Sequence, residues 1–360
     1  MKILITGGHV TPAIAVIEEI QKRFPDWEIV FVGRKYAMVG EKEVSAEYRL
    51  ISDLGIRFLS LTTGRSTPVR SLLKISFGLV QALWYVFKEK PAIIVSFGGY
   101  IAFPVVIAGW ILGIPSLTHE QTRIAGGANL WIAKIAKKVC VSYADTVDMF
   151  PKEKTVCTGL PLRRDLFIVP KKPLFTLSAR YPLVYIAGGA TGSESINKYI
   201  FSMLPELLTK YTLVHQTGYS SYSNARGKSR LLSKDQSSRY HIFPYISVSD
   251  LSWIYHCAKL YIGRSGGNTV GELAALGKVA ILIPLPWSIG GEQEKNAQWL
   301  VEAGSAIILP QRDLPDQLLK KIDEVLSRFT IYHQHAQAFA KTIPRNGALR
   351  MCSEIQHLLS

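Results

Sequence analysis

The sequence is poor in acidic residues relative to basic ones. The 360 residues include 27 aspartates and glutamates against 42 lysines and arginines, which leaves a net charge of +15. Such an excess indicates anionic partners, which could be nucleic acid, an anionic membrane surface or phosphorylated substrates. No DNA- or RNA-binding motif occurs, so we expect no nucleic-acid partner and favour the other two.

Cysteines and metal-binding patterns are also scarce. The four cysteines have neither a metal-type nor a redox-type spacing, and we interpret them as reduced thiols. No Asp-x-Asp occurs, so a metal-bridged diphosphate site would lack its usual ligands, and we expect no metal and no cofactor. No signal peptide is evident, because Met1-Lys2 leads directly into an apolar strand, and this favours a cytoplasmic location.

One long segment, residues 91–119, carries no formal charge. Gly98, Gly99 and Pro104 interrupt it, and its order is strand, glycine turn, helix, glycine, strand. A membrane-spanning helix needs about 20 apolar residues without such breaks. We therefore interpret the segment as a βαβ unit rather than a transmembrane helix.

Short apolar strands alternate with helices in both halves of the chain. We predict strands at residues 3–6, 28–32, 93–96, 116–119, 183–187, 212–216, 259–262 and 280–283. We predict helices at residues 12–24, 101–112, 128–137, 195–210, 269–276 and 349–358. The polar stretch 219–240 is expected to be a mobile loop with some helix. A basic, proline-containing stretch at 159–173 suits a linker.

This alternation predicts an α/β protein with two doubly wound, Rossmann-like domains that face a central ligand cleft. Four glycine clusters follow strands and precede helices: Thr6-Gly7-Gly8, Gly98-Gly99, Gly188-Gly189 and Gly266-Gly267. Glycine allows backbone to approach a ligand, and a helix N-terminus offers free N–H groups. None of the clusters matches G-x-G-x-x-G or the P-loop, which argues against a dehydrogenase or an NTPase.

The segment from Arg264 to Glu272 is the strongest single element. Arg264, Ser265 and Gly266 place a cation, a hydroxyl and a helix N-terminus together, so they could hold a diphosphate without metal. Glu272 lies one to two turns into the following helix and could accept hydrogen bonds from a ribose diol. The alternative for Glu272 is a solvated helix carboxylate.

Polar residues at the ends of other strands are further candidates. His9 follows the first glycine cluster and could deprotonate a hydroxyl or bind a phosphate; alternatively it only caps the turn. His119-Glu120-Gln121 ends an apolar strand and suggests a site, with a surface loop as the alternative. Carboxylates and amides at 290–296 suit sugar hydroxyls, although acidic loops are usually just solvated.

Apolar and basic residues mix at 64–90, where Arg65, Arg70, Lys74, Lys88 and Lys90 accompany many aliphatic and aromatic residues. This pattern fits an amphipathic surface on anionic lipid and, equally, an ordinary core helix with one solvated face.

Taken together, these motifs resemble the MurG family of bacterial N-acetylglucosaminyltransferases (glycosyltransferase family 28), in order and over nearly the whole chain. The residues that carry the resemblance are 6–13, 98–100, 119–121, 124–126, 159–163, 188–189, 215–218, 264–266, 269–270, 272 and 293–297. The resemblance implies a GT-B fold with an acceptor domain at 1–162, a donor domain at 163–340 and a C-terminal helix at 341–360 that crosses back to the first domain.

The implied reaction is inverting transfer of N-acetylglucosamine from UDP-N-acetylglucosamine to O4 of the muramoyl sugar of undecaprenyl-pyrophosphoryl-N-acetylmuramoyl-pentapeptide (lipid I). The product is lipid II, a peptidoglycan precursor, and cell shape and division would depend on it. The implied partners are UDP-N-acetylglucosamine, lipid I and the anionic inner leaflet, with the protein peripheral on the cytoplasmic face of the cell membrane.

The resemblance also implies roles for individual residues. On the donor side these are diphosphate contact for Arg264, Ser265 and Gly266, ribose contact for Glu272, uracil contact for the Ile246 backbone, sugar contact for Gln293 and a hinge position for Arg163. Near the reaction centre and on the acceptor side they are Thr6, Gly7, Gly8, His9, Gly98, Gly99, Tyr100, His119 and Glu120. His9 is the first candidate for the general base, and Glu120 the second.

The chain departs from the family pattern at four places. The first loop is shorter than the usual Gly-Gly-Gly-Thr-Gly-Gly-His, and Thr122 replaces an asparagine. Ala190 replaces a serine, so Thr191 or Ser193 would have to supply a donor-side hydroxyl, and Glu292 replaces the first sugar-facing glutamine. Three alternatives stay open: a transferase with another lipid acceptor such as diacylglycerol, a UDP-N-acetylglucosamine 2-epimerase, and a non-catalytic binding module.

Overall fold

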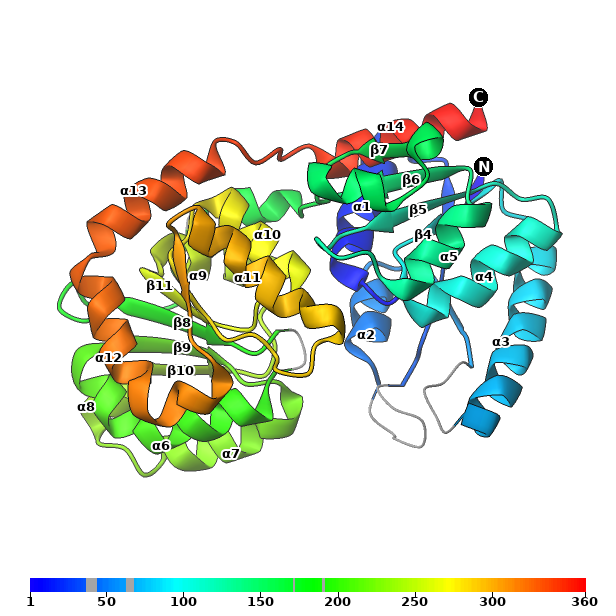
Figure 1. The fold of residues 1–360 in the computed structure, drawn as a ribbon. Helices are drawn as coiled ribbons and strands as arrows, with labels where there is room; N and C mark the ends of the chain where they lie inside the picture. The colour runs from blue at the N-terminus through cyan, green and yellow to red at the C-terminus, as the bar shows by residue number, and fades with distance from the viewer. Residues whose placement is uncertain (37–43, 63–67, 171, 190–191) are drawn as a thin grey trace. The chain divides into compact units, whose positions relative to one another are not determined.

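The computed structural model describes residues 1–36, 44–62, 68–170, 172–189 and 192–360, and for residues 46, 68–75 and 289 only the backbone. The chain divides into two compact units (Figure 1). Unit 1 comprises Met1–Arg163 and Pro344–Ser360, and unit 2 comprises Arg164–Ile343. The acceptor and donor roles of the predicted domains, and the cleft between them, stay predictions.

Unit 1 contains a seven-stranded parallel sheet in the order β3-β2-β1-β4-β5-β6-β7. Its strands are β1 (Lys2–Thr6), β2 (Glu28–Gly33), β3 (Arg57–Ser60), β4 (Ile93–Ser96), β5 (Ser116–Glu120), β6 (Lys138–Val141) and β7 (Thr155–Cys157). The order reverses between β1 and β4, where Thr6 pairs with Ser96 at the carboxyl ends. In doubly wound sheets this switch point is where ligands bind.

Helices cover both faces of this sheet. They are α1 (Val10–Arg23), α2 (Ala46–Asp53), α3 (Pro68–Glu89), α4 (Gly99–Ile111), α5 (Gly127–Ile135) and α14 (Gly347–Leu359), with 3-10 helices at Ala144–Met149 and Lys152–Lys154. Successive strand residues point to opposite faces, so Ile3 and Ile5 pack with α1 and α14, whereas Leu4 packs with α3, α4 and α5. The C-terminal α14 therefore completes the core of unit 1, against α1.

Unit 2 contains a six-stranded parallel sheet in the order β10-β9-β8-β11-β12-β13. Its strands are β8 (Leu183–Ala187), β9 (Thr212–Gln216), β10 (Tyr240–Phe243), β11 (Leu260–Gly263), β12 (Ala280–Leu282) and β13 (Ala306–Ile308). The switch point lies between β8 and β11, where Ala187 pairs with Gly263.

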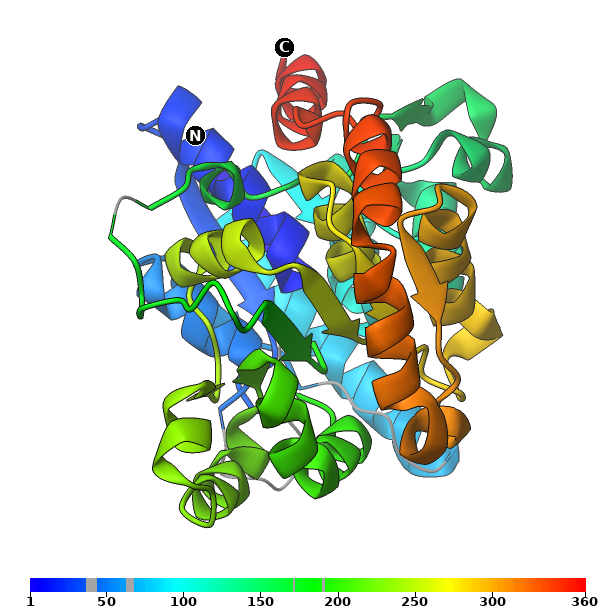
Figure 2. The ribbon, with the colours of Figure 1, turned by 90° about the vertical axis from the view of Figure 1, so that its left-hand side faces the viewer.

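Helices also cover both faces of the second sheet, as the turned view of Figure 2 shows. They are α6 (Glu194–Lys210), α7 (Tyr219–Ser229), α8 (Lys234–Ser238), α9 (Val248–Cys257), α10 (Gly267–Leu276), α11 (Glu292–Glu302), α12 (Leu314–Ser327) and α13 (Phe329–Ala340), with 3-10 helices at Arg164–Phe167, Ile289–Gly291 and Gln311–Asp313. Val184 and Ile186 pack with α6 and α12, and Tyr185 packs with α9 and α10.

The predicted doubly wound α/β class is confirmed in both units. Residues 91–119 form β4, α4 and β5, so the βαβ interpretation is confirmed. Within the described ranges, no helix has both the length and the hydrophobicity that crossing a membrane requires. The stretch 219–240 was expected to be a loop with some helix, but it is mainly helical, because α7 and α8 occupy most of it. A capping box at Ser233 and Gln236 begins α8, and it outweighs the polar composition.

Candidate functional site

The four glycine clusters lie at the two switch points. Gly7 and Gly8 follow β1 and Gly98 follows β4, and the Gly8 N–H donates to the Gly98 carbonyl over 3.0 Å. Gly7 has a φ of 144°, and a Cβ there would lie 2.8 Å from Phe97 backbone atoms. Only glycine allows these two loops to approach so closely. In unit 2 the loops after β8 and β11 are the corresponding pair.

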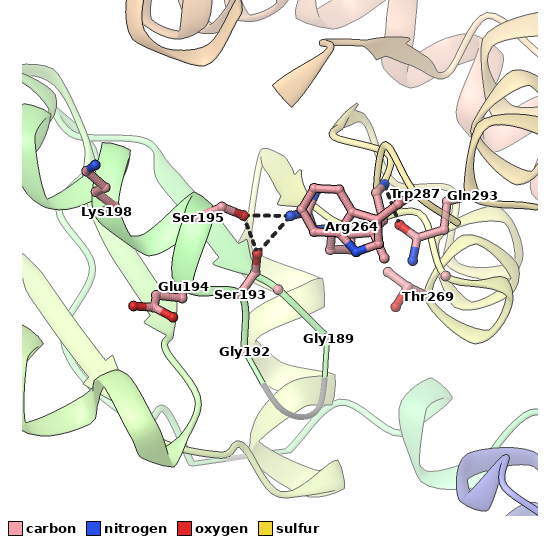
Figure 3. A pocket seen from close by; sticks show the side chains of 13 residues that line it. Gly189, Gly192, Ser193, Glu194, Ser195, Lys198, Arg264, Thr269, Trp287 and Gln293 are labelled. Carbon is pink, nitrogen blue, oxygen red and sulfur yellow. Dashed lines mark hydrogen bonds between the residues drawn. The ribbon is translucent and has the colours of Figure 1, made fainter. Parts of the chain in front are cut away.

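A cavity of about 650 Å³ opens at the switch point of unit 2 (Figure 3). Its volume lies within the range of small-molecule sites. It is lined by Gly188, Gly189, Gly192, Ser193, Glu194, Ser195, Lys198, Arg264, Gly266, Thr269, Leu285, Trp287 and Gln293. Three residues predicted for the donor site, Arg264, Gly266 and Gln293, thus lie on one cavity.

Arg264 is almost fully buried, and its guanidinium is surrounded by protein acceptors. Nη1 donates to the carbonyls of Ile283 and Pro284 over 3.1 and 3.2 Å. Nη2 lies 2.9 and 2.8 Å from the hydroxyls of Ser193 and Ser195 (Figure 3) and 2.6 Å from Oε1 of Gln311. Burial lowers the pKa of Arg264, but an arginine stays protonated in proteins.

These contacts change the expected role of Arg264. Of the five N–H groups of a guanidinium, only Nε–H has no acceptor in the described part of the chain. The side chain ties the loop after β8 and the start of α6 to the end of β12. We therefore interpret Arg264 as a residue that positions the glycine loop, while its direct contact with a diphosphate stays a prediction.

The neighbours of Arg264 differ in what they offer to a ligand. The Ser265 hydroxyl donates to the Gln293 carbonyl over 2.7 Å, so it connects α10 to α11. Gly266 is the N-cap of α10, and a Cβ there would meet nothing within 4 Å. The free N–H groups of the first turn of α10 therefore adjoin open space, which suits an anionic group.

Glu272 and Ile246 do not line the cavity. Glu272 is 6% exposed, and the Tyr255 hydroxyl lies 3.5 Å from its carboxylate. The alternative of a solvated helix carboxylate is therefore wrong. Ile246 is buried in the core beside α9. Their predicted contacts with ribose and uracil stay predictions.

Gln293 presents one half of its amide to the cavity. Its Oε1 accepts a hydrogen bond from the Leu285 N–H over 3.0 Å, which fixes the orientation of the side chain. Its Nε2 has no partner among the described residues and remains available to a hydroxyl of a ligand. Glu292 lies outside the lining, and its Oε1 accepts from Asn296 over 3.4 Å. Ala190 and Thr191 lie outside the described residues, but Ser193, the other hydroxyl considered, lines the cavity.

Sequence reasoning missed several side chains of this cavity, namely Glu194, Ser195, Lys198, Leu285 and Trp287. Trp287 lines it and is 70% exposed, which is unusual for a tryptophan. Lys198 extends from α6 (Figure 3). The signal for Trp287 was its place directly after Pro284-Leu285-Pro286 and shortly before the predicted Gln293 segment. For Lys198 no local signal exists, because it is one lysine on an amphipathic helix.

His9 lies at the switch point of unit 1, at the N-cap of α1. Its side chain makes no capping hydrogen bond, so the interpretation that it only caps the turn is wrong. Burial lowers the pKa of His9, and the charge of Glu120 opposes this shift. The imidazole is therefore neutral at pH 7 and able to accept a proton. The Thr6 hydroxyl is buried without a partner among the described residues.

Glu120 ends β5 and is buried in a network of hydrogen bonds. Oε1 accepts from the N–H of Thr122 over 3.1 Å and lies 2.9 Å from its hydroxyl. Oε2 accepts from the N–H of Gly126 and from Nδ2 of Asn129, each over 2.9 Å. The surface-loop alternative is therefore wrong. A carboxylate with four such partners anchors its loop, which favours His9 as the base.

The other acceptor-side candidates are spread over the same edge of the sheet. His119 is fully buried, its Nε2 lies 3.2 Å from the Ser142 hydroxyl, and burial lowers its pKa to about 3. Tyr100 begins α4, and its ring centroid lies 5.4 Å from the Arg34 guanidinium. Gly99 also lines this edge, next to Gly8. Arg163, predicted at the hinge, is a buried residue at the end of unit 1's first segment.

Comparison with known proteins identifies both halves. The chain matches the glycosyltransferase family 28 N-terminal domain over residues 6–141 and the glycosyltransferase family 28 C-terminal domain over residues 183–348. It is 34% identical, over 90% of its length and 88% of the relative, to the UDP-N-acetylglucosamine–N-acetylmuramyl-(pentapeptide) pyrophosphoryl-undecaprenol N-acetylglucosamine transferase of Thermodesulfovibrio yellowstonii. A relative of the same name from Ectopseudomonas mendocina is 31% identical over 97% of this chain and 96% of its own.

The structure is similar to the crystal structure of MurG from Acinetobacter baumannii, with a TM-score of 0.71, 25% identity and 99% of each chain covered. The predicted GT-B class and the resemblance to the MurG family are both confirmed. The chain belongs to glycosyltransferase family 28.

Proposed function

We propose that the protein transfers N-acetylglucosamine from UDP-N-acetylglucosamine to O4 of the muramoyl sugar of undecaprenyl-pyrophosphoryl-N-acetylmuramoyl-pentapeptide, with inversion at C1, in peptidoglycan synthesis. The observation that carries this proposal is the cavity of unit 2. It is lined by the N-terminus of α10, by the glycine loop that Arg264 holds in place, and by the Gln293 amide, whose Oε1 is already hydrogen-bonded. The names of relatives that share about a third of the sequence support the choice of substrates.

The cavity suits a nucleotide sugar. The diphosphate would lie against the N–H groups that begin α10, beside Gly266 and Thr269. Gln293 would direct its free Nε2 to a sugar hydroxyl, and the exposed ring of Trp287 would cover an apolar face of the sugar. Because these donors are fixed before the reaction, they would stabilise the charge that develops on the departing UDP.

His9 is proposed as the general base. Since burial lowers its pKa, the imidazole is unprotonated at neutral pH and can accept the proton of the attacking O4 hydroxyl. The attack displaces UDP from the opposite face of C1 in one step, and this accounts for inversion. The transition state would resemble an oxocarbenium ion, as in glycoside hydrolysis.

A transfer assay tests the proposal. Radiolabelled UDP-N-acetylglucosamine is incubated with the protein and lipid I, in EDTA, and parallel reactions contain diacylglycerol or no acceptor. Label in the lipid fraction with lipid I is the expected result. Transfer only to diacylglycerol would contradict the acceptor, and conversion of the donor without any acceptor would indicate an epimerase.

We further propose that unit 1 docks on the cytoplasmic face of the cell membrane through α3. Phe77, Val80, Trp84 and Phe87 are each more than half exposed, and their spacing places them on one stripe of the helix. The opposite side of α3 packs in the core, and the exposed stripe would be the side that contacts lipid. The side chains of Arg65, Arg70 and Lys74 lie outside the described residues.

On α3 and on the nearby α5, an exposed tryptophan is paired with a lysine. Lys88 Nζ lies 4.8 Å from the ring centroid of Trp84, and Lys134 Nζ lies 3.9 Å from that of Trp131 on α5. Helices α3, α4 and α5 lie side by side on one face of the sheet (Figure 1). Exposed tryptophans beside lysines suit the boundary between anionic headgroups and acyl chains. Attachment there would bring the protein to a lipid-linked acceptor.

A further inference from the structure

A second cavity, of about 440 Å³, lies between α6 and α7 in unit 2. On α6 it is lined by residues with helical spacing, and on α7 by residues of the first turn and the face that follows. The lining residues are Glu194, Asn197, Lys198, Phe201, Ser202, Ser220, Ser221, Asn224 and Lys228. We call this cavity the α6–α7 groove.

The α6–α7 groove has cations on both walls. Lys198 extends from α6 and Lys228 from α7, and neither forms an ion pair with any residue that the structure describes. Glu194 is the one acidic side chain in the described lining. An anion bound in the groove would be attracted by both lysines.

The first turn of α7, which contributes Ser220 and Ser221 to the lining, adds further donors. Gly218 caps α7 without a side-chain hydrogen bond, and the first turn of α7 contains no acidic residue. Ser221, in this first turn, is only 9% exposed, and its hydroxyl has no hydrogen-bond partner in the described ranges. The hydroxyl oxygen itself opens on the groove, so it can donate a hydrogen bond to a ligand there. The helix N-terminus and the Ser221 hydroxyl thus point to the same kind of ligand as the lysines do.

The groove is also rigid where a ligand would rest. Asn197 Oδ1 lies 3.0 Å from Nε2 of His215, and its Nδ2 donates to the Thr217 carbonyl over 2.8 Å. This buried pair joins α6 to the end of β9, immediately before α7. The two walls are therefore held at a fixed separation without the help of a ligand.

We propose that the α6–α7 groove binds a phosphate or diphosphate group of a ligand other than the sugar donor. Lys198 and Lys228 would neutralise it, and Ser221 and the N–H groups of α7 would donate hydrogen bonds to its oxygens. Glu194 and Lys198 line both cavities, so the site adjoins the cavity at the switch point. The binding does not depend on the identity of the donor. The phosphate can belong to a soluble anion or to a lipid headgroup.

Titration calorimetry with inorganic pyrophosphate tests this site, with and without saturating UDP. The variants are Lys228→Gln and Ser221→Ala, and the matched control is Arg226→Gln, an exposed cation of the same helix that does not line the groove. We expect pyrophosphate to bind in the presence of UDP, with about fivefold weaker affinity in Lys228→Gln. Ser221→Ala should weaken binding by a similar factor, and Arg226→Gln should leave it unchanged.

Three results would overturn the proposal. They are no binding of pyrophosphate, complete competition by UDP, and equal weakening by Arg226→Gln and Lys228→Gln. Thermal denaturation of each variant verifies that it is folded. Flotation with phosphatidylglycerol vesicles then separates the two sources of phosphate. Weaker flotation of Lys228→Gln than of Arg226→Gln assigns the groove to a lipid headgroup, and equal flotation assigns it to a soluble anion.

Discussion

Replacing Arg264 with lysine separates two roles that the charge and the shape of this side chain would play. If Arg264 acts by charge alone, lysine preserves most of its function. If it acts by holding the glycine loop, lysine fails, because a single ammonium group cannot reach the acceptors of both Nη1 and Nη2. The structure favours the second role, since Nη1 and Nη2 contact five acceptors from separate segments.

The loss of stability expected for Arg264→Lys follows from these contacts. A hydrogen bond from a charged donor contributes about 1.5–3 kcal/mol to stability. Water in the adjoining cavity would replace the contacts to Ser193 and Ser195, but the carbonyl of Ile283 belongs to a fully buried residue. We therefore expect Arg264→Lys to lower the free energy of unfolding by about 2–4 kcal/mol. The melting temperature of unit 2 should fall by about 5–10 °C.

Calorimetry with UDP measures the functional consequence. A displaced glycine loop should weaken UDP binding by about tenfold or more in Arg264→Lys, and Arg264→Ala should behave similarly. The matched control is Arg312→Lys, because Arg312 is exposed and lies next to Gln311. An Arg264→Lys protein with native melting temperature and native UDP affinity would refute the positioning role.

Four further expectations follow from single side chains. His9→Ala should lower kcat by about 10²–10⁴-fold without loss of UDP affinity, and the wild-type kcat/KM should fall as the pH drops through the lowered pKa of His9, below 6.5. Trp287→Ala should raise the KM for the donor about tenfold, and Trp287→Phe should restore most of it in steady-state assays. Burial lowers the pKa of His215 from 6.5 to about 3, so the unfolded chain binds a proton at His215 before the folded chain does. Above pH 6.5 the folded protein therefore has its full stability with respect to His215, and between pH 6.5 and about 3 its free energy of unfolding decreases as the pH falls. Denaturant titrations of His215→Gln should therefore show a stability slope in that window that is smaller by about 1.4 kcal/mol per pH unit. Trp84→Ser should weaken flotation with phosphatidylglycerol vesicles about tenfold, whereas Leu231→Ser, which also removes an exposed apolar side chain but in unit 2, should not.

Local patterns predicted most of the fold, because the strands of a covered parallel sheet are buried on both faces and therefore appear in the sequence as short apolar runs. Strands such as 93–96 and 183–187 are apolar on both faces, and the structure has them at the predicted bounds. The stretch 219–240 was misjudged because α7 has almost no amphipathic pattern and only two buried residues, Ser221 and Ala225. Tertiary packing, which a single sequence does not display, decides such a helix.

Residue patterns predicted the candidate site best where one short segment carries it. Arg264, Ser265 and Gly266 follow β11 directly, and their cation, hydroxyl and glycine form a pattern that is visible in the sequence. By contrast, Arg264 meets Ser193 and Ser195 across about 70 residues and Gln311 across 47. Contacts of that separation depend on the strand order, which brings β8 and β11 together, and no local spacing encodes it.

The strand order also explains why an arginine rather than a glycine-rich motif alone secures the loop. At a switch point the connections leave two neighbouring strands toward opposite faces of the sheet, so no helix or strand spans the gap between them. In unit 1 the gap is closed by backbone, through the Gly8 N–H and the Gly98 carbonyl. In unit 2 the cavity keeps the loops apart, and a long side chain must bridge them. Arg264 is the residue at the carboxyl end of β11 that reaches both sides, and its substitution should therefore cost more than that of any single acceptor it holds.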